Sequence, residues 1–112
     1  MSTLPSNIKR GSAELAILAL LEEQPLHGYE IAKRIEKQTG GVLRFDVASL
    51  YPVLYGLERR GIVKGEWDKA PSGRERRYYK LTPAGKKKLQ PLRQQWKEFF
   101  RALDQLAGVH HA

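Results

Sequence analysis

The chain has 112 residues, 41% of them hydrophobic, and carries 20 lysines and arginines against 12 aspartates and glutamates. This length and apolar content fit one compact domain with a modest core. The sequence contains no cysteine, which excludes disulfides, a thiolate nucleophile and a zinc site built from cysteine. The formal net charge of +8 and the pI near 9.9 favour a polyanionic partner, nucleic acid first and an acidic membrane surface second.

The basic residues are concentrated in one segment. Of the 20 lysines and arginines, 12 lie within residues 59–93, where only Glu66, Asp68 and Glu75 oppose them. The rest of the chain is close to neutral, so this segment supplies the whole positive excess. Such clustering favours nucleic-acid binding, and the alternative is a basic face that is merely solvated.

The first residues of the chain give no sign of export or membrane insertion. The segment MSTLPSNIKR lacks the apolar core of a signal peptide. The longest apolar stretch, residues 15–21, is far too short to cross a bilayer. We therefore expect a soluble, cytoplasmic protein without a membrane partner.

Two helices are predicted in the first third of the chain. Residues 12–23, SAELAILALLEE, are apolar almost all round, with Ser12 as the expected N-cap, which predicts a buried helix. The next segment, HGYEIAKRIEKQTGG, places Ile31 and Ile35 on one face and predicts an amphipathic helix that ends at the double glycine. His27 is expected to be a capping or turn residue at its start.

The segment SLYPVLYGLERRGIV, residues 49–63, predicts a third helix. Asp46 is its expected N-cap, and Pro52 favours a start nearer Ser49, because an interior proline removes a hydrogen bond. At 100° per residue, three leucines share one sector and are expected in the core: Leu50, Leu54 and Leu57. The opposite side carries Ser49, Pro52, Tyr55, Gly56 and Arg59.

A β-hairpin and a long helix complete the chain. The segments IVKGEWDK and RRYYKL are rich in β-branched and aromatic residues and flank the turn-forming APSG, which predicts two antiparallel strands. Tyr78 and Tyr79 are expected to pack within this hairpin. Thr82 and Pro83 then predict an N-cap and a first helical residue for a helix that extends towards Ala107.

This order predicts a mainly α fold with a small β-hairpin: a winged helix-turn-helix domain over residues 8–81 and a C-terminal dimerisation helix over residues 82–107. In such domains the third helix lies in the DNA major groove, and the hairpin, or wing, contacts the backbone or the minor groove. Hydroxyls and a cation on the outer face of the third helix suit phosphates and base edges. The expected contacts on that helix are Ser49, Tyr51, Pro52, Tyr55 and Arg59, although Tyr51 could equally brace the second helix.

Three segments, LLEEQPLHGYEIAKRIE, SLYPVLYGLERRGIV and GRERRYYKLTPAG, occur in an order and spacing that resembles the PadR family of transcriptional regulators, in its short branch with a single C-terminal helix. The resemblance covers residues 11–106. It implies a homodimeric repressor that binds a palindromic operator in double-stranded DNA and is released by a small effector. It also implies DNA contacts by the helix-turn-helix residues Tyr29, Ser49, Tyr51 and Pro52 and by the wing residues Gly73, Arg74 and Arg76.

The C-terminal helix carries a second pattern. Its apolar residues are spaced alternately by three and four positions, as in a coiled-coil seam: Leu89, Leu92, Trp96, Phe99, Leu103 and Leu106. So small a domain cannot cover them all, so we expect a partner helix from a second copy. Pro91 is expected to kink the helix or to remove a hydrogen bond. Trp96, with Phe99 and Phe100, is the candidate site for a planar aromatic effector, and the alternative is ordinary dimer packing.

The sequence offers little for catalysis. It shows no nucleophile motif, no phosphate-binding glycine loop and no metal-ligand spacing, so we expect no enzymatic activity, cofactor or metal. His110 and His111 follow the last helical signal and are expected at a frayed end. The remaining alternative is a winged-helix module for protein association. The apolar seam fits this alternative, but the clustered positive charge does not.

Overall fold

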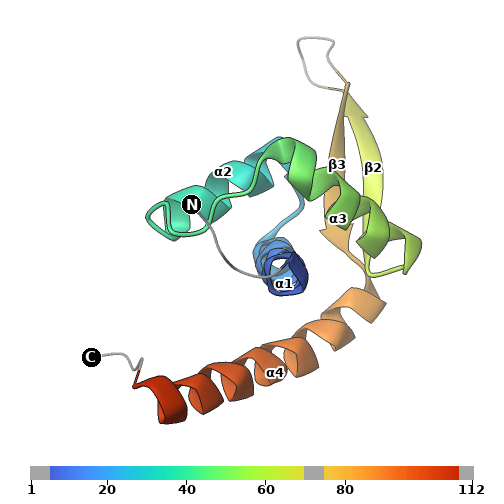
Figure 1. Cartoon of the computed structure of the whole chain (residues 1–112). Coiled ribbons are helices and arrows are strands. Elements are labelled where there is room, and N and C mark those ends of the chain that lie inside the picture. Colours follow the sequence, from blue (N-terminus) through green and yellow to red (C-terminus); the bar gives the residue numbers. More distant parts are fainter. Residues whose placement is uncertain (1–5, 70–74, 109–112) are drawn as a thin grey trace.

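The computed structural model describes residues 6–69 and 75–108, which form four helices and a three-stranded sheet (Figure 1). In chain order the elements are α1 (Ser6–Glu23), β1 (Leu26–His27), α2 (Gly28–Gln38), α3 (Val47–Arg59), β2 (Val63–Lys69), β3 (Glu75–Leu81) and α4 (Pro83–Ala107). The predicted mainly α fold with a small hairpin is confirmed.

Helix α1 is central to the core and contacts α2, α3, α4 and β3. Its apolar run is buried as predicted, at Ala13, Ile17, Leu18, Leu20 and Leu21. The prediction of Ser12 as N-cap is wrong, because α1 begins at Ser6 and Ser12 lies inside it. Gly11 does not end the helix: α4 packs so closely here that a methyl group on Gly11 would stand 3.2 Å from Cζ2 of Trp96. Packing thus outweighs the low helix propensity of glycine.

The turn after α2 is organised by one threonine side chain. Thr39 Oγ1 donates to the carbonyl of Ile35 at 2.8 Å and accepts the N–H of Leu43 at 3.1 Å. Gly40 and Gly41 follow with φ of 60° and 83°, a left-handed region that glycine enters at little cost. The expected double-glycine stop is therefore confirmed, and the turn leads the chain towards α3.

Helix α3 begins earlier than the sequence suggested. Asp46 is the N-cap residue as predicted, and its carbonyl accepts the N–H groups of Ser49 and Leu50 at 2.9 and 3.0 Å. The start nearer Ser49 is therefore wrong, and Pro52 lies inside the helix. Proline has no N–H, so the Ala48 carbonyl cannot receive the usual intrahelical bond. Both residues are exposed, so water can reach that carbonyl.

The sheet has one strand more than the predicted hairpin. Its order is β1-β3-β2, with both pairs antiparallel. Strand β1 consists only of Leu26 and His27, which pair with Tyr79 and Tyr78. Two residues cannot display an alternation, so no pattern indicated this strand. The packing expected of Tyr79 is confirmed, since its side chain is 0% exposed in the core.

Helix α4 begins with the predicted cap. Thr82 Oγ1 accepts the N–H of Gly85 at 3.0 Å and donates to the carbonyl of Gly61 at 2.6 Å, which ties α4 to the end of α3. A side chain at Gly85 would overlap the Ile62 carbonyl, so only glycine fits there. The helix continues through Pro91, along a curved path (Figure 1).

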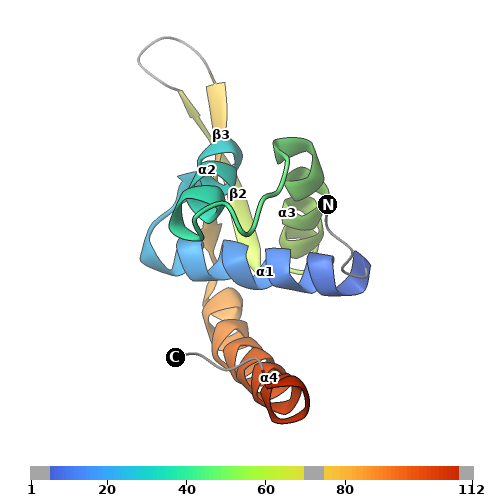
Figure 2. The ribbon, with the colours of Figure 1, turned by 60° about the vertical axis from the view of Figure 1, so that its left-hand side comes forward.

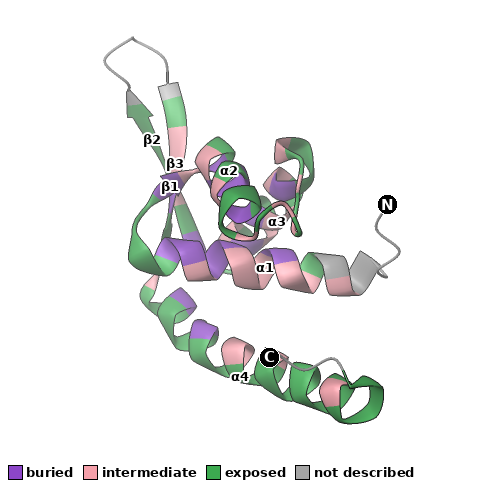
Figure 3. Ribbon diagram, turned by 90° about the vertical axis from the view of Figure 1, so that its left-hand side faces the viewer, coloured by how far each residue is buried: buried purple, intermediate pink, exposed green. Residues whose placement is uncertain are grey.

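The wing, formed by β2 and β3, and α4 extend from opposite sides of the helical core (Figures 1 and 2). Figure 3 shows that the buried residues of α4 are confined to its first turns, whereas most of the remaining helix is exposed. Within the part of the chain that the structure describes, no helix is long and apolar enough to span a membrane.

Candidate nucleic-acid interface

The outer face of α3 is open to solvent. The leucines on its inner face, Leu50, Leu54 and Leu57, are at most 1% exposed, as predicted. On the opposite side lie the exposed candidates for DNA contact, namely Ser49, Pro52, Tyr55 and Arg59. A helix anchored by one buried stripe, with hydroxyl, aromatic and guanidinium groups facing outward, suits the major groove.

Tyr51 braces α3 against the start of α2. A methyl group on the buried Gly28 would stand 3.0 Å from both Cζ and the hydroxyl oxygen of Tyr51. The Tyr51 ring is half-buried, and its centroid lies 5.7 Å from that of Tyr55. The packing role that the sequence left open is therefore present, while DNA contact by Tyr51 stays a prediction.

Tyr29 lies in the first turn of α2 and is 62% exposed. Lys33, one turn later, places its Nζ 5.5 Å from the centroid of the Tyr29 ring. This lysine was missed by the sequence interpretation, although the spacing of four residues on a helix is a signal for such a pair. Together the two side chains present a ring and a cation on the same helix face.

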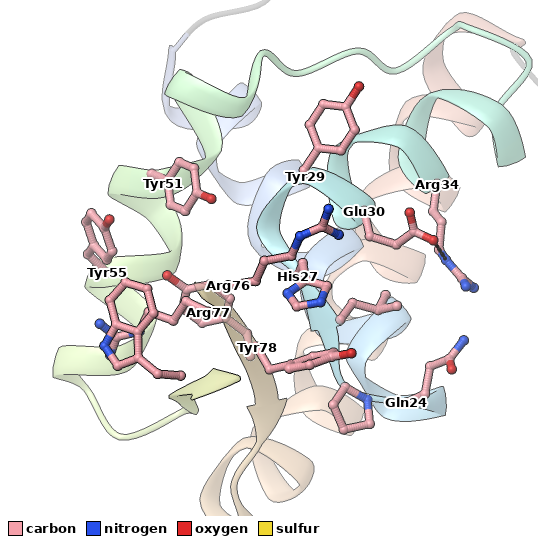
Figure 4. A pocket seen from close by; sticks show the side chains of 14 residues that line it. Gln24, His27, Tyr29, Glu30, Arg34, Tyr51, Tyr55, Arg76, Arg77 and Tyr78 are labelled. Atoms are coloured by element: carbon pink, nitrogen blue, oxygen red, sulfur yellow. Dashed lines mark ion pairs between the residues drawn. The ribbon is translucent and has the colours of Figure 1, made fainter. Parts of the chain in front are cut away.

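A cavity of about 940 Å³ lies between α2, α3 and the wing (Figure 4). Tyr29 of α2, Tyr55 of α3 and Arg76 of β3 are among the residues that line it. His27 is the N-cap residue of α2, as expected, but its side chain makes no capping hydrogen bond. Its ring instead packs on Tyr78, with 3.7 Å between the centroids.

Burial also affects the chemistry of this cavity. Tyr79 lines it from the core side, and burial raises the pKa of its hydroxyl to about 12. Like any tyrosine hydroxyl it is neutral at neutral pH, and the raised pKa keeps it protonated at higher pH than usual. Of the three arginines that line the cavity, Arg34 pairs with Glu30 and Arg77 with Glu58. Arg76 forms no ion pair with a described carboxylate, so its guanidinium can donate hydrogen bonds to an anion.

The two adjacent arginines of β3 have different environments. Arg76 is exposed, and among the side chains that the structure describes it forms no ion pair. Arg77 is half-buried and paired with Glu58 of α3. The wing-tip candidates Gly73 and Arg74 lie outside the described residues.

Several other cations of the basic segment pair with carboxylates of the chain itself. Lys80 Nζ lies 2.9 Å from Glu66 Oε1, and the hydrogen bond from Lys80 lowers the pKa of the Glu66 carboxyl. Arg93 Nη2 lies 2.6 Å from Glu22 Oε1, and Arg60 pairs with Glu14. The cations with no ion pair to a described carboxylate include Arg59 and Arg76, so these two charges are available to phosphates.

The effector candidates form an aromatic cluster on α4. The Trp96 centroid lies 5.6 Å from those of Phe99 and Phe100. Trp96 is half-buried, whereas Phe99 and Phe100 are 39% and 56% exposed. A cavity of about 280 Å³ is lined by Trp96 and Phe99 together with Ile8 and Gln95. The seam continues outward through Leu103 and Leu106, which are 41% and 89% exposed.

No group of three histidine, aspartate or glutamate side chains close enough to hold a metal ion occurs within residues 6–69 and 75–108. The candidate nucleic-acid interface is a surface of the described chain. It consists of the outer face of α3, the first turn of α2 and the exposed side of the wing.

Comparisons with known proteins identify the family and the fold of the chain. The sequence profile described as the transcriptional regulator PadR-like family matches residues 17–91. Transcriptional regulator Rv3488 of Mycobacterium tuberculosis is 30% identical over 103 residues, which cover 92% of this chain and 91% of that protein. A transcriptional regulator from Clostridium thermocellum has a similar structure, with a TM-score of 0.82, 28% identity and coverage of 94% of this chain and 99% of that chain.

A further similar structure is that of Bacillus subtilis PadR in complex with operator DNA. Its TM-score is 0.65 at 28% identity, and the match covers 70% of this chain and 44% of that chain. The family profile spans the second half of α1, the helix-turn-helix, the wing and the start of α4. This chain therefore belongs to the PadR-like family, whose members are transcriptional regulators and not enzymes.

Proposed function

We propose that the protein is a homodimeric repressor that binds a palindromic operator in double-stranded DNA and is released by a small effector. One observation carries the DNA-binding part of the proposal. Tyr55 of α3 and Arg76 of the wing line one cavity, and the other outer-face residues of α3 are exposed, while the leucines behind α3 are fixed in the core. The operator complex of Bacillus subtilis PadR supports the same use of this fold.

The exposed residues fall into two roles. Ser49 and Tyr55 on the outer face of α3 are proposed to contact base edges, where hydroxyl groups accept or donate hydrogen bonds. Phosphate contacts are proposed for Tyr29, Arg59 and Arg76, since basic and hydroxyl side chains provide most such contacts. Pro52 allows close approach of α3, and Gly73 and Arg74 remain proposed wing contacts.

The homodimer is proposed to form through α4. The second half of its seam is exposed in the single chain, from Phe99 to Leu106. A heptad seam needs a facing helix, and a two-fold dimer matches the symmetry of a palindrome. The effector is proposed to bind beside Trp96, between flat aromatic walls that suit a planar molecule. Ordinary packing of the aromatic cluster is the competing role.

DNA binding is tested by enriching a random duplex library with the full chain and measuring affinity for the enriched duplex and for a scrambled one. We expect selective binding that weakens steeply with salt, because phosphate contacts release counterions. Footprinting of DNA that flanks the protein's own gene would then locate the natural site. An equal and weak affinity for both duplexes at physiological salt would instead favour the protein-association module.

A repressor acts where the chromosome is, so the cytoplasmic location is part of the same proposal. Transcription of a reporter downstream of the footprinted site would separate repression from activation. Lower transcription in the presence of the protein is expected, and higher transcription would contradict the repressor role.

A further inference from the structure

Helix α3 and both strands of the wing meet at one carboxylate. Glu58, in the last turn of α3, forms an ion pair with Arg77 of β3. The same Glu58 oxygen accepts the backbone N–H of Gly65 in β2 at 3.3 Å. The side chains of Glu58 and Arg77 are 27% and 28% exposed. Water therefore screens the attraction between their charges less than it would at the surface.

Strand β2 lies at the edge of the sheet, because the strand order is β1-β3-β2. An edge strand has N–H groups that point away from its only neighbour and need another acceptor. For Gly65 this acceptor is Glu58 of α3. The contact therefore joins the wing to α3 through backbone as well as side chain.

Gly65 also makes room for the arginine. A methyl group on Gly65 would overlap the guanidinium of Arg77, with Cζ at only 2.9 Å. Gly65 is not among the glycines with positive φ, so its backbone conformation does not require glycine. The close passage of Arg77 is thus the reason in this structure for glycine at position 65. A larger residue there would displace the guanidinium, which is the flexible end of a side chain.

The guanidinium of Arg77 is held further by two rings. Its Cζ lies 5.7 Å from the ring centroid of Trp67 and 5.8 Å from that of Tyr79. Aromatic rings at this distance attract a cation and restrict its movement. Arg77 is therefore fixed within the chain, whereas the exposed Arg76 beside it faces solvent.

We propose that Glu58 and Arg77, with the close approach allowed by Gly65, form a clamp that fixes the angle between α3 and the wing, so that both are positioning residues for operator selectivity. This inference rests on the proposed DNA-binding function. A helix in one groove and a wing beside it must fit the duplex at the same time, and a preset angle avoids the cost of ordering them on binding. The clamp residues themselves need not touch DNA.

The effect of one substitution on DNA binding separates this positioning role from a simple effect of charge. Glu58→Ala removes a negative charge next to a DNA-binding face, so charge alone would tighten binding to every duplex. Loss of the clamp instead lowers the preference for the enriched duplex over the scrambled one. Glu66→Ala is the matched control: it also removes one carboxylate, but this one lies in β2 and pairs with Lys64 and Lys80 of the wing itself, not with α3.

Gly65→Ala tests the clamp without any change of charge. We expect Gly65→Ala and Glu58→Ala each to lower the affinity ratio of enriched to scrambled duplex by about tenfold, the size of losing one base-pair contact. Glu66→Ala should keep the wild-type ratio. The double variant of Glu58→Ala and Gly65→Ala should be no worse than either single variant, because both break the same contact.

The experiment uses fluorescence anisotropy with the full chain, the enriched duplex and the scrambled duplex. Circular dichroism and thermal unfolding establish that each variant folds. Arg77→Lys, which keeps the charge but loses the guanidinium fork, replaces Glu58→Ala if that variant does not fold. Without DNA, the Gly65 amide proton should move upfield in Glu58→Ala, which reports the lost hydrogen bond directly.

The clamp would be overturned if Glu58→Ala kept the wild-type ratio and bound both duplexes more tightly, as charge alone predicts. The clamp would also be contradicted if the fold-loss of the affinity ratio in the double variant equalled the product of the two single fold-losses. Such a product indicates two independent effects, because independent effects are additive in free energy. If the wild type enriches no duplex, the proposed function fails and the clamp with it. If the wild type prefers the enriched duplex and the Glu58→Ala and Gly65→Ala variants keep the same affinity ratio, only the clamp is overturned.

Discussion

The indole of Trp96 lies against Gly11 of α1, with Cζ2 only 3.2 Å from the place of a methyl group on that glycine. This contact divides the apolar seam of α4 into two parts. Leu89 is buried in the chain's own core and Leu92 packs partly against it. Beyond Trp96 the seam is exposed, at Phe99, Leu103 and Leu106. Trp96 therefore lies at the boundary between the chain's own packing and the face proposed for a partner.

The dimer proposal predicts the effect of one exposed seam residue. Leu103→Asp places a charge in the proposed interface, where an unpaired buried charge is costly, so the variant should sediment as a monomer at micromolar concentration. Its far-UV circular dichroism should match the wild type, because Leu103 is 41% exposed in the single chain. Gln105→Ala, an exposed α4 residue outside the seam, is the control. A wild type that is itself monomeric would refute the dimer.

The effector proposal predicts that Trp96 reports ligand binding. A planar dye or phenolic compound should quench tryptophan fluorescence and release DNA in the wild type, and both effects should be lost in Trp96→Leu. Trp67 also emits but lies in the wing, so Trp67→Phe is the matched control and should keep both the quenching and the release of DNA. Quenching that persists in Trp96→Leu, or binding that leaves DNA affinity unchanged, would reduce Trp96 to a packing residue.

The outer face of α3 is predicted to provide base readout. Ser49→Ala and Tyr55→Ala should each reduce the preference for the enriched duplex, by about 1 to 3 kcal/mol for a true base contact. Affinity for a scrambled duplex should change less, because phosphate contacts carry no sequence information. Competition binding against both duplexes measures the ratio. Full discrimination in both variants would place the readout elsewhere.

The wing is predicted to contribute a phosphate contact through Arg76. Arg76→Ala should weaken binding to all duplexes and reduce the slope of log affinity against log salt by up to about one unit. Lys97→Ala removes the same charge from exposed α4 and should leave the slope unchanged if α4 faces away from DNA. An unchanged slope in Arg76→Ala would remove this residue from the interface.

Tyr79 predicts how stability depends on high pH. Burial raises the pKa of its hydroxyl from 10.0 to about 12, whereas the unfolded chain releases this proton near the ordinary value. The neutral Tyr79 hydroxyl therefore contributes fully to the free energy of unfolding below about pH 10. This contribution is lost as the pH rises towards about 12. Between about pH 9 and pH 11, the wild type should lose about 1 kcal/mol more unfolding free energy than Tyr79→Phe. Urea unfolding at both pH values measures this difference, and equal losses would contradict the prediction.

The sequence by itself determined the features that depend on neighbouring residues. The spacing of Leu50, Leu54 and Leu57 predicted the buried face of α3, because side chains three and four apart share one side of a helix. Thr82 and Pro83 predicted the start of α4, because capping involves only the first helical turn. The three quoted motifs were also sufficient to predict the family that the profile match shows.

The tertiary structure decided which of these groups are available to a partner. Arg76 and Arg77 are adjacent and chemically identical, and only the approach of Glu58, 19 residues before Arg77, neutralises one of them. Strand β1 is too short for a pattern and exists because β3 offers it a neighbour. Likewise, the ring of Trp96 meets α1 only because the chain folds α4 back along it. These outcomes depend on pairs of residues far apart in the chain, and local periodicity contains no information about such pairs.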